Sequence, residues 1–219
     1  MLPPNSYRRY VGRHEDQSLR IWAEKCSRLS TKRSVLDIGA YKGEFSLLAR
    51  KANSLSRVIA FEPNHYLIEQ LREACEPVQI EVVEAAVSGT TGTVSFNMDD
   101  AQSRILVGSE TTVMQHMATV KSIALDDWVQ QEGIEPGLIK IDVEGAEGSI
   151  LRAAQWVLST YSPAIICEVL HDDAGREVMD ALPPDYRYYR IEENGGIYQE
   201  EKIWRPRWRD HNWLLQPSQ

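Results

Sequence analysis

Two stretches of this chain each carry an acidic residue at or near the end of an apolar strand. Residues 35–43 read VLDIGAYKG, so the strand leads through Asp37 into a glycine turn, and an amphipathic helix pattern follows. Residues 58–62 read VIAFE and end at Glu62, 25 residues after Asp37. Glycine lets backbone pass close to a ligand because it has no Cβ, and a strand-end acid can accept hydrogen bonds from both ribose hydroxyls. The pair predicts an α/β fold that binds a nucleoside.

The spacing of the first stretch argues against a nicotinamide dinucleotide. That fingerprint is G-x-G-x-x-G, whereas residues 37–43 read D-x-G-x-x-x-G, with Asp37 in place of the first glycine. A carboxylate would repel a pyrophosphate, but it would attract a sulfonium and an ammonium group. S-adenosylmethionine has both cations, a ribose and no phosphate. An ordinary strand-to-helix connection can carry the same glycine turn, so the acid at Glu62 is what favours this cofactor.

Length and charge narrow the class of protein. A chain of 219 residues suits one domain that buries its own core. The formal net charge of −8 disfavours nucleic acid as the main ligand. Two basic stretches run against this charge, and we interpret them as solvated segments with partly packed tryptophans: Arg8, Arg9 and Arg13, and Arg205, Arg207 and Arg209 beside Trp204 and Trp208.

Cysteine usage and hydropathy predict a cytoplasmic location. Cys26, Cys75 and Cys167 have neither close spacing nor a metal-binding pattern, so we expect free, buried thiols in a reducing compartment. No stretch approaches the roughly 18 consecutive apolar residues of a spanning helix. The first residues also lack the charged-then-apolar order of a secretory signal.

Strands alternate with helix patterns along most of the chain, which predicts a doubly wound, mostly parallel sheet with ligands at the carboxyl ends of its strands. We expect an N-terminal helical segment over 1–32 and one domain over 33–219. The polar stretch 97–119 shows no period and is expected to be a substrate-side insertion. The expected strands lie at 34–38, 57–61, 78–83, 138–142 and 164–169, with two short ones near 186–191 and 212–215.

The five expected parallel strands all finish at or next to an acid: Asp37, Glu62, Glu84, Asp142 and Glu168. Carboxylates gathered on one rim repel one another unless a cationic or protic group is present. A sulfonium cofactor together with a hydroxylated acceptor would supply both.

Six phrases, LDIGAYKGEFS, AFEPN, AAVSG, ALDDW, KIDVEGAE and IICEV, resemble in order and spacing the FkbM family of S-adenosylmethionine-dependent methyltransferases. The resemblance covers about residues 33–170, and KIDVEGAE is its specific part. It implies the Rossmann-like, seven-stranded sheet of class I methyltransferases, with the last strand antiparallel. It also implies methylation of a hydroxyl oxygen of a sugar, polyketide or other secondary metabolite.

The resemblance also implies roles for individual residues. Asp37, Gly39 and Gly43 would form the loop at the methionine end of the cofactor, Glu62 would hold the ribose, and Asp142 would lie by the methyl group. The remaining expected cofactor contacts are Ala40, Tyr41 and Pro63, with Glu84 and Ala85 near the adenine. Tyr41 departs from the family, since many members carry a small polar residue there, usually Asn.

Methylation of an aliphatic hydroxyl needs a group that removes the proton. Asp142 and His171 are the candidate bases, and Glu144, Glu168 and His116 are expected on the acceptor side. Carboxylates and an imidazole could also ligate magnesium, but no spacing compels it, and we expect no metal. We expect a small-molecule acceptor and no membrane, and we leave a homo-oligomer open. The alternatives are a nucleic-acid or protein methyltransferase, or a cofactor-binding module without catalysis.

Overall fold

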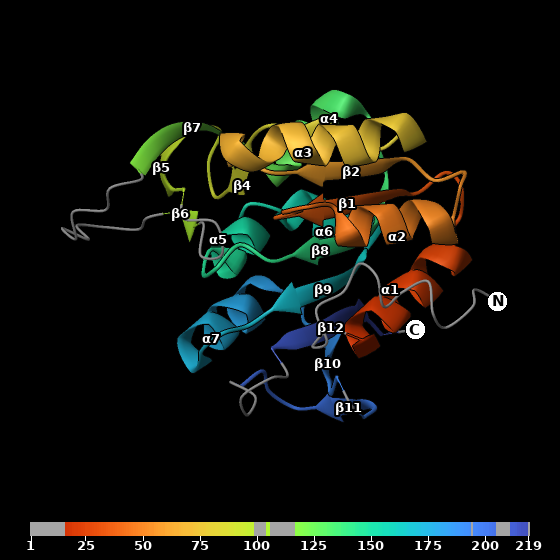
Figure 1. The fold of residues 1–219 in the computed structure, drawn as a ribbon. Helices are drawn as coiled ribbons and strands as arrows, with labels where there is room; N and C mark the ends of the chain where they lie inside the picture. The colour runs from red at the N-terminus through yellow and green to blue at the C-terminus, as the bar shows by residue number, and fades with distance from the viewer. Residues whose placement is uncertain (1–15, 99–103, 106–116, 194, 205–210, 219) are drawn as a thin grey trace.

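The computed structural model describes residues 16–98, 104–105, 117–193, 195–204 and 211–218. A large sheet lies at its centre, with helices on both faces (Figure 1). In spatial order the strands of this sheet are β11 (Ile197–Glu200), β10 (Tyr186–Ile191), β12 (Asn212–Pro217), β9 (Ala164–Glu168), β8 (Pro136–Ile141), β1 (Ser34–Ile38), β2 (Val58–Phe61) and β3 (Glu81–Val83).

The sheet reverses its winding between β1 and β8. From β1 the chain proceeds outward to β2 and β3, and it later returns to place β8 on the other side of β1, with every pair from β3 to β9 parallel. β12 runs antiparallel to both β9 and β10, as the resemblance implied for the last strand. The mostly parallel α/β class is confirmed. β11 adds an eighth strand to the expected seven, because residues 197–200 fold back on β10 as a hairpin.

Each face of the sheet packs against its own set of helices. One face is covered by α1 (Asp16–Arg28), α2 (Glu44–Ala52) and α3 (His65–Cys75), and the other by α4 (Leu125–Glu132), α5 (Glu147–Arg152), α6 (Gln155–Tyr161) and α7 (Asp172–Ala181). Because side chains alternate along a strand, Leu36 and Ile38 of β1 pack in the core on the α4–α7 face. Val35 packs in the core on the α1–α3 face. Strands buried on both faces read as continuous apolar runs, which explains the sequence of β1 and β2.

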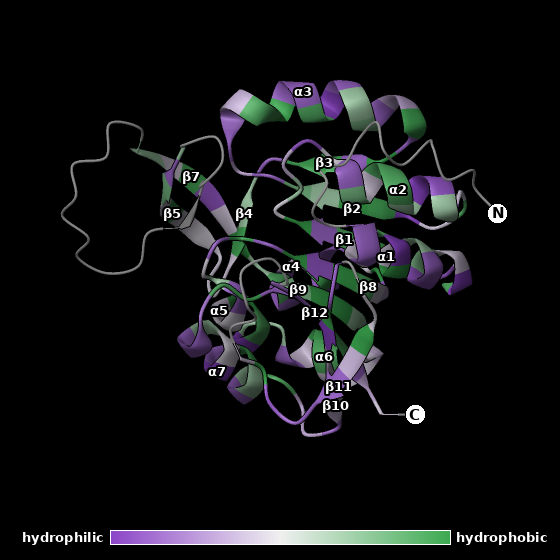
Figure 2. Cartoon of the chain, turned by 60° about the horizontal axis from the view of Figure 1, so that its bottom comes forward, coloured by the Kyte–Doolittle hydropathy of each residue, from purple (hydrophilic) through white to green (hydrophobic). Residues whose placement is uncertain are grey.

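A second, smaller sheet lies beside the first and is built from the segment after β3. Its strands, in spatial order, are β4 (Ala86–Ser88), β7 (Met117–Ala124), β5 (Gly92–Asn97) and β6 (Arg104–Ile105). Figures 1 and 2 both draw it projecting away from the main sheet. Within the stretch 97–119, for which the sequence shows no period, residues 104–105 and 117–119 form strands that pair with β5.

Two other boundaries differ from expectation. Val78 lies in a short 3₁₀ helix (Glu76–Val78), and β3 begins only at Glu81, because Pro77 favours the helical turn. After Gly145 the chain forms two short helices, α5 and α6, in place of one continuous helix. All three cysteines are free and buried, as expected. None of the helices in the described ranges combines the length and apolar character that crossing a membrane requires.

Candidate active site at the reversal point of the sheet

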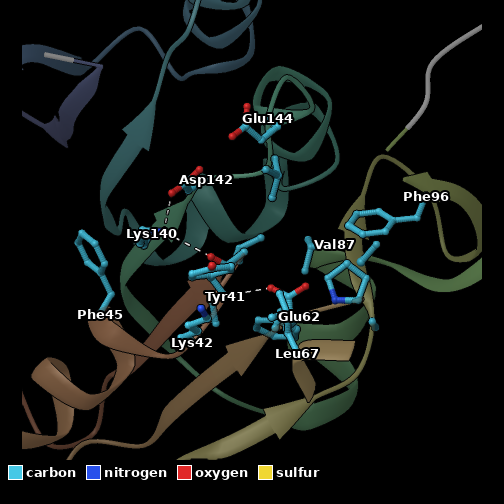
Figure 3. Close-up of a pocket in the computed structure, with 18 of the residues that line it drawn as sticks. Tyr41, Lys42, Phe45, Glu62, Leu67, Val87, Phe96, Lys140, Asp142 and Glu144 are labelled. Carbon is cyan, nitrogen blue, oxygen red and sulfur yellow. Dashed lines mark hydrogen bonds and ion pairs between the residues drawn. The ribbon is translucent and has the colours of Figure 1, made fainter. Parts of the chain in front are cut away.

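A cavity of about 360 Å³ opens at the carboxyl ends of β1, β2 and β8. This volume lies within the usual range of small-molecule sites. Its lining comes from the ends of β1, β2 and β8, the loop before α2, and the small sheet: Ile38, Gly39, Ala40, Tyr41, Lys42, Glu44, Phe45, Phe61, Glu62, Pro63, Leu67, Ala85, Ala86, Val87, Phe96, Lys140, Asp142, Val143 and Glu144. Figure 3 shows Asp142 and Glu144 on one side of it and Glu62 on another.

The loop from β1 to α2 turns sharply to reach this cavity. Gly39, Tyr41 and Gly43 have φ angles of 77°, 50° and 83°, all in the left-handed region. Tyr41 is the costly member, since a side chain in this region is strained by about 1–2 kcal/mol. A Cβ on Gly39 would lie 1.8 Å from the main-chain oxygen of Asp142. Glycine is thus required here because two strand ends meet, whatever ligand the loop holds.

The side chain of Glu62, just after β2, is held in place by two hydrogen bonds. Its side chain is buried, with Oε2 accepting from the main-chain N–H of Tyr41 at 2.9 Å and Oε1 from that of Asn64 at 2.9 Å. Burial raises the pKa of Glu62 to about 7, although these two hydrogen bonds oppose the rise. Each carboxylate oxygen can accept more than one hydrogen bond, so Glu62 can also receive a pair of ribose hydroxyls from the cavity.

An apolar wall faces Glu62 and comes partly from the second sheet. Val87 lies on β4 and Phe96 on β5, and Leu67 belongs to α3. Val87 and Phe96 lie on the side of the cavity away from Phe45 (Figure 3). These side chains are buried and carry no polar group, so they could pack on a flat aromatic base.

A buried lysine stands beneath the reversal point. Lys140 Nζ lies 3.0 Å from Asp142 Oδ2, 3.4 Å from the Gly39 carbonyl oxygen and 4.0 Å from Asp37 Oδ1. The other oxygen of Asp37 accepts from the Ser46 hydroxyl at 2.6 Å. Burial raises the pKa of Asp37, and its attraction to Lys140 opposes that rise.

Asp142 and Glu168 form a pair of carboxyl groups in opposite protonation states. Burial is the largest single influence on Asp142 and works against its ionisation, but the charge of Lys140 and the hydrogen bonds from Lys140 and Glu168 together hold the Asp142 pKa below its usual value. Burial and the neighbouring Asp142 charge raise the pKa of Glu168 to about 10. At neutral pH Glu168 therefore keeps its proton and donates to ionised Asp142.

Glu144 completes a group of three carboxyls with oxygens within 4.8 Å of one another. Such a spacing could admit a divalent cation, but the Asp142–Glu168 hydrogen bond already accounts for the closeness of two of the three carboxyls. The loop that carries Glu144 is held by Glu147, whose Oε1 accepts from the N–H groups of Gly145 at 3.0 Å and Val143 at 3.4 Å.

Several residues that the sequence predicts for the site lie elsewhere. Asp37 is inside β1 and Gly43 is the residue just before α2, and neither lines the cavity. Glu84 is exposed and pairs with Arg72 at 3.1 Å, so only its neighbour Ala85 reaches the expected adenine region. His171 is exposed and caps α7, its Nδ1 accepting from the Ala174 N–H at 3.1 Å.

The other predicted residues can be placed as follows. Those at the cavity are Gly39, Ala40, Tyr41, Glu62, Pro63, Ala85, Asp142 and Glu144. Glu168 does not line the cavity, but it is hydrogen-bonded to Asp142, which does. His116 lies outside the described residues, as do the arginines of the two basic stretches. Sequence reasoning missed Leu67, Val87 and Phe96, whose apolar character suits a core as well as a pocket, and it gave Lys140 no role beyond pairing with an acid.

Comparison with known proteins supplies the family. Residues 37–195 match the model of the methyltransferase FkbM domain. The hexuronic acid methyltransferase AglP of Haloferax volcanii is 26% identical over 134 residues, which cover 59% of this chain and 53% of that protein. This chain therefore spans about half the length of that curated relative.

Solved structures share the fold at low identity. Methyltransferase FkbM from Methylobacillus flagellatus KT superposes with a TM-score of 0.59 at 18% identity, covering 86% of this chain and 44% of that chain. The O-methyltransferase TomG from Streptomyces achromogenes, solved in complex with SAM, gives a TM-score of 0.53 at 11% identity, covering 100% of this chain and 92% of that one. With the family model matching most of its length, this chain belongs to the FkbM methyltransferase family.

Proposed function

We propose that this protein is an S-adenosylmethionine-dependent methyltransferase that acts on a hydroxyl group of a small molecule. The observation that carries the proposal is a cavity with the buried Glu62 carboxylate on one side and the ionised Asp142 carboxylate on another. The first suits a ribose and the second suits a proton acceptor near a reacting methyl group.

The residues present fit this cofactor. Glu62 presents two acceptor oxygens for the ribose hydroxyls, and Val87, Leu67 and Phe96 offer an apolar wall for the adenine. Asp142, Glu144 and Glu44 line the cavity together with Glu62, so its acids outnumber its two lysines, Lys42 and Lys140, and this balance suits a sulfonium and an α-ammonium group. A pyrophosphate would meet these carboxylates instead of a row of N–H donors.

When bound, S-adenosylmethionine would supply an electrophilic methyl group whose bond to sulfur breaks with the electron pair going to sulfur. The chain's own contribution is to hold the acceptor hydroxyl in line and to take its proton. Asp142 is ionised and half-buried, so it can accept that proton. Its low pKa is adequate because the hydroxyl proton becomes strongly acidic as the oxygen donates an electron pair to the new bond. Glu168, which keeps its proton, orients Asp142 and is not the base.

The acceptor class rests on the relatives. One curated relative is named a hexuronic acid methyltransferase and one structural neighbour is an O-methyltransferase, which supports a small hydroxylated acceptor such as a sugar. The nucleic-acid alternative is less favoured because residues 142–145, after β8, read DVEG and lack the Asn- or Asp-Pro-Pro-aromatic segment typical of amino-methylating enzymes.

Two measurements test the proposal. Calorimetry should show micromolar-range binding of S-adenosylmethionine and S-adenosylhomocysteine and none of NAD. Methyl-labelled cofactor, incubated with separate small-molecule, RNA and protein fractions of a cell extract, should then label the small-molecule fraction only. The matched control is Glu62→Ala, which should label less than the wild type at a cofactor concentration near the wild-type Kd. NAD binding without S-adenosylmethionine binding, or label confined to RNA or protein, would refute the proposal.

A further inference from the structure

Strand geometry places the buried cation Lys140 beside Asp142, the Gly39 loop and Asp37. β1 and β8 pair in parallel register with Asp37 opposite Lys140, and the strand period of two turns Lys140 and Asp142 toward the same face. Lys140 is 4% exposed, and its ammonium also lies 4.7 Å from the centre of the Phe45 ring. Figure 3 draws its bonds to Asp142 and to the loop beside it.

Each contact of Lys140 belongs to a different segment. The Gly39 carbonyl is part of the loop that would carry the cofactor, Asp142 is the acceptor-side carboxylate, and Asp37 is inside the sheet. The main chains of the first two segments already touch, because the Asp142 N–H donates to the Ile38 carbonyl at 3.1 Å. The lysine adds a side-chain tie between the same two segments.

Charge neutralisation alone does not explain this arrangement. A buried ion pair is seldom more stable than apolar residues of the same volume, since both ions lose their hydration. If Lys140 served only Asp37, its ammonium would be expected nearest to that residue. It lies instead 3.0 Å from Asp142 and 4.0 Å from Asp37.

We propose that Lys140 is a positioning residue that fixes the Asp142 carboxylate relative to the Gly39 loop, so that proton acceptor and cofactor are set by one ammonium group. The proposal rests on the methyltransferase function proposed above. It assigns Asp37 the part of a buried counter-ion, held in place by Ser46.

The decisive experiment compares Lys140→Met with the charge-balanced pair Lys140→Met/Asp37→Asn. Methionine keeps the length of the side chain, and asparagine can still accept from Ser46. We expect the single variant to lose both thermal stability and turnover, because it leaves Asp37 buried without its cation. The double variant should recover most of the stability but should keep a turnover about 10–100-fold below the wild type, with Asp142 no longer fixed. Recovery of full turnover in the double variant would overturn the proposal.

A second readout does not depend on turnover. Carboxyl-carbon NMR on the double variant should show a higher pKa for Asp142 than in the wild type, because the attraction that lowers it is gone. The other charged or titratable groups around Asp142 and Lys140 remain in both proteins: Glu44, Glu62, Glu144, Glu147, Cys167 and Glu168. The pH–rate profile should gain an acidic limb at the new pKa, since activity needs the ionised form.

Failure of the proposed function would look different. If neither the wild type nor the variants transfer a methyl group to any fraction of the cell extract, the proposed function is wrong. The NMR titration and the affinity for S-adenosylhomocysteine still test the role of Lys140 in that case. We expect the affinity of the double variant to fall about 3–10-fold through the loosened Gly39 loop. An unchanged Asp142 pKa together with unchanged affinity would show that Lys140 positions neither group.

Discussion

At the scale of single residues, the site is defined by carboxyl groups that differ in environment. Glu62, Asp142 and Glu168 are all acids at the ends of strands, yet burial and neighbours give them three different pKa values. Of these three, Asp142 is the one with an ammonium partner at 3.0 Å. Two acids whose pKa values are driven apart by their surroundings are the usual basis for assigning a proton donor and a proton acceptor.

Asp142→Asn keeps the shape of the side chain but removes its charge and basicity. We expect turnover to fall by about 10²-fold or more, with a smaller change in affinity for S-adenosylhomocysteine. His171→Ala is the matched comparison for the second candidate base. Because His171 caps α7, its loss should cost about 0.5–2 kcal/mol of stability and leave turnover unchanged. Steady-state kinetics and thermal unfolding of both variants check this, and the reverse pattern of turnover would move the base to His171.

The alkaline side of the pH–rate profile should report Glu168. Its pKa of about 10 means that it loses its proton there, and two adjacent carboxylates would then repel each other. We expect turnover to fall as the pH rises through that value. Glu168→Gln keeps a hydrogen-bond donor and cannot ionise, so it should remove this limb. A limb that persists in Glu168→Gln would have another origin.

Cofactor affinity should depend on the ionisation of Glu62. The pKa of Glu62 in the free protein is raised to about 7, so its carboxylate is protonated as the pH falls through that value. Because ribose hydroxyls bind the ionised form best, affinity should weaken as the pH falls from one unit above this pKa to one unit below it, with proton release on binding. Glu62→Ala should cost about 1–3 kcal/mol of binding free energy on the alkaline side. Glu62→Gln, measured by calorimetry on both sides, should be weak and independent of pH.

At the scale of elements, the site exists because two strand ends interlock. The sequence alone suggests that a side chain at Gly39 obstructs the ligand with little effect on the fold. The structure changes that reason, because the obstacle is the main chain of Asp142, whose oxygen lies 1.8 Å from the position that a Cβ would take. The β1 and β8 loops cannot keep their contact around any larger residue.

Gly39→Ala should therefore lose stability as well as cofactor affinity. Left-handed strain and the clash together should cost at least about 2–3 kcal/mol of unfolding free energy. Gly133→Ala is a matched control, since Gly133 has a φ of 60° but nothing within 4 Å of its Cβ position. It should lose only the strain energy and keep full affinity. Denaturant unfolding and calorimetry decide the matter, and equal stability losses in the two variants would contradict the interlock.

At the scale of the whole molecule, a residue near the C-terminal end of the fold is hydrogen-bonded to the first helix, α1. Glu193, just after β10, accepts from the main-chain N–H groups of Gln17 at 2.9 Å and Ser18 at 3.0 Å, and it bonds the Ser18 hydroxyl. It thereby caps the N-terminus of α1, which packs on α2 through the Trp22–Phe45 ring contact. The acceptor for these N–H groups thus comes from a residue 175 positions along the chain from Ser18.

Glu193→Ala should destabilise the fold without touching the cavity. It leaves two N–H groups of α1 without their acceptor, at a cost of about 1–3 kcal/mol. Affinity for S-adenosylhomocysteine should stay at the wild-type value, because Glu193 does not line the site. Glu201→Ala, at an exposed acid of the same region, should change neither quantity. Thermal unfolding and calorimetry would contradict this account if the Glu193 variant kept full stability.

The order of residues along the chain determined the fold class and the position of the site. Apolar runs that end in acids and glycine turns fix strands, and alternation of strands with helices forces a parallel sheet with its ligands at the carboxyl ends. The proximity of Lys140 and Asp142 also follows from the sequence alone, since residues two apart on a strand point to the same face. Gly39, Glu62 and Asp142 could therefore be predicted at the cavity without any structure.

Only the tertiary structure decided which of the acids act together. Strand-end position does not say where a side chain points, so Glu84 pairs with Arg72 on the surface while Glu168 meets Asp142. Nor does sequence reveal that Phe96, on a separate sheet, closes the cavity, because contacts between elements distant in the chain depend on packing. Protonation states were decided last, since a pKa depends on burial and on the charges that the fold brings near.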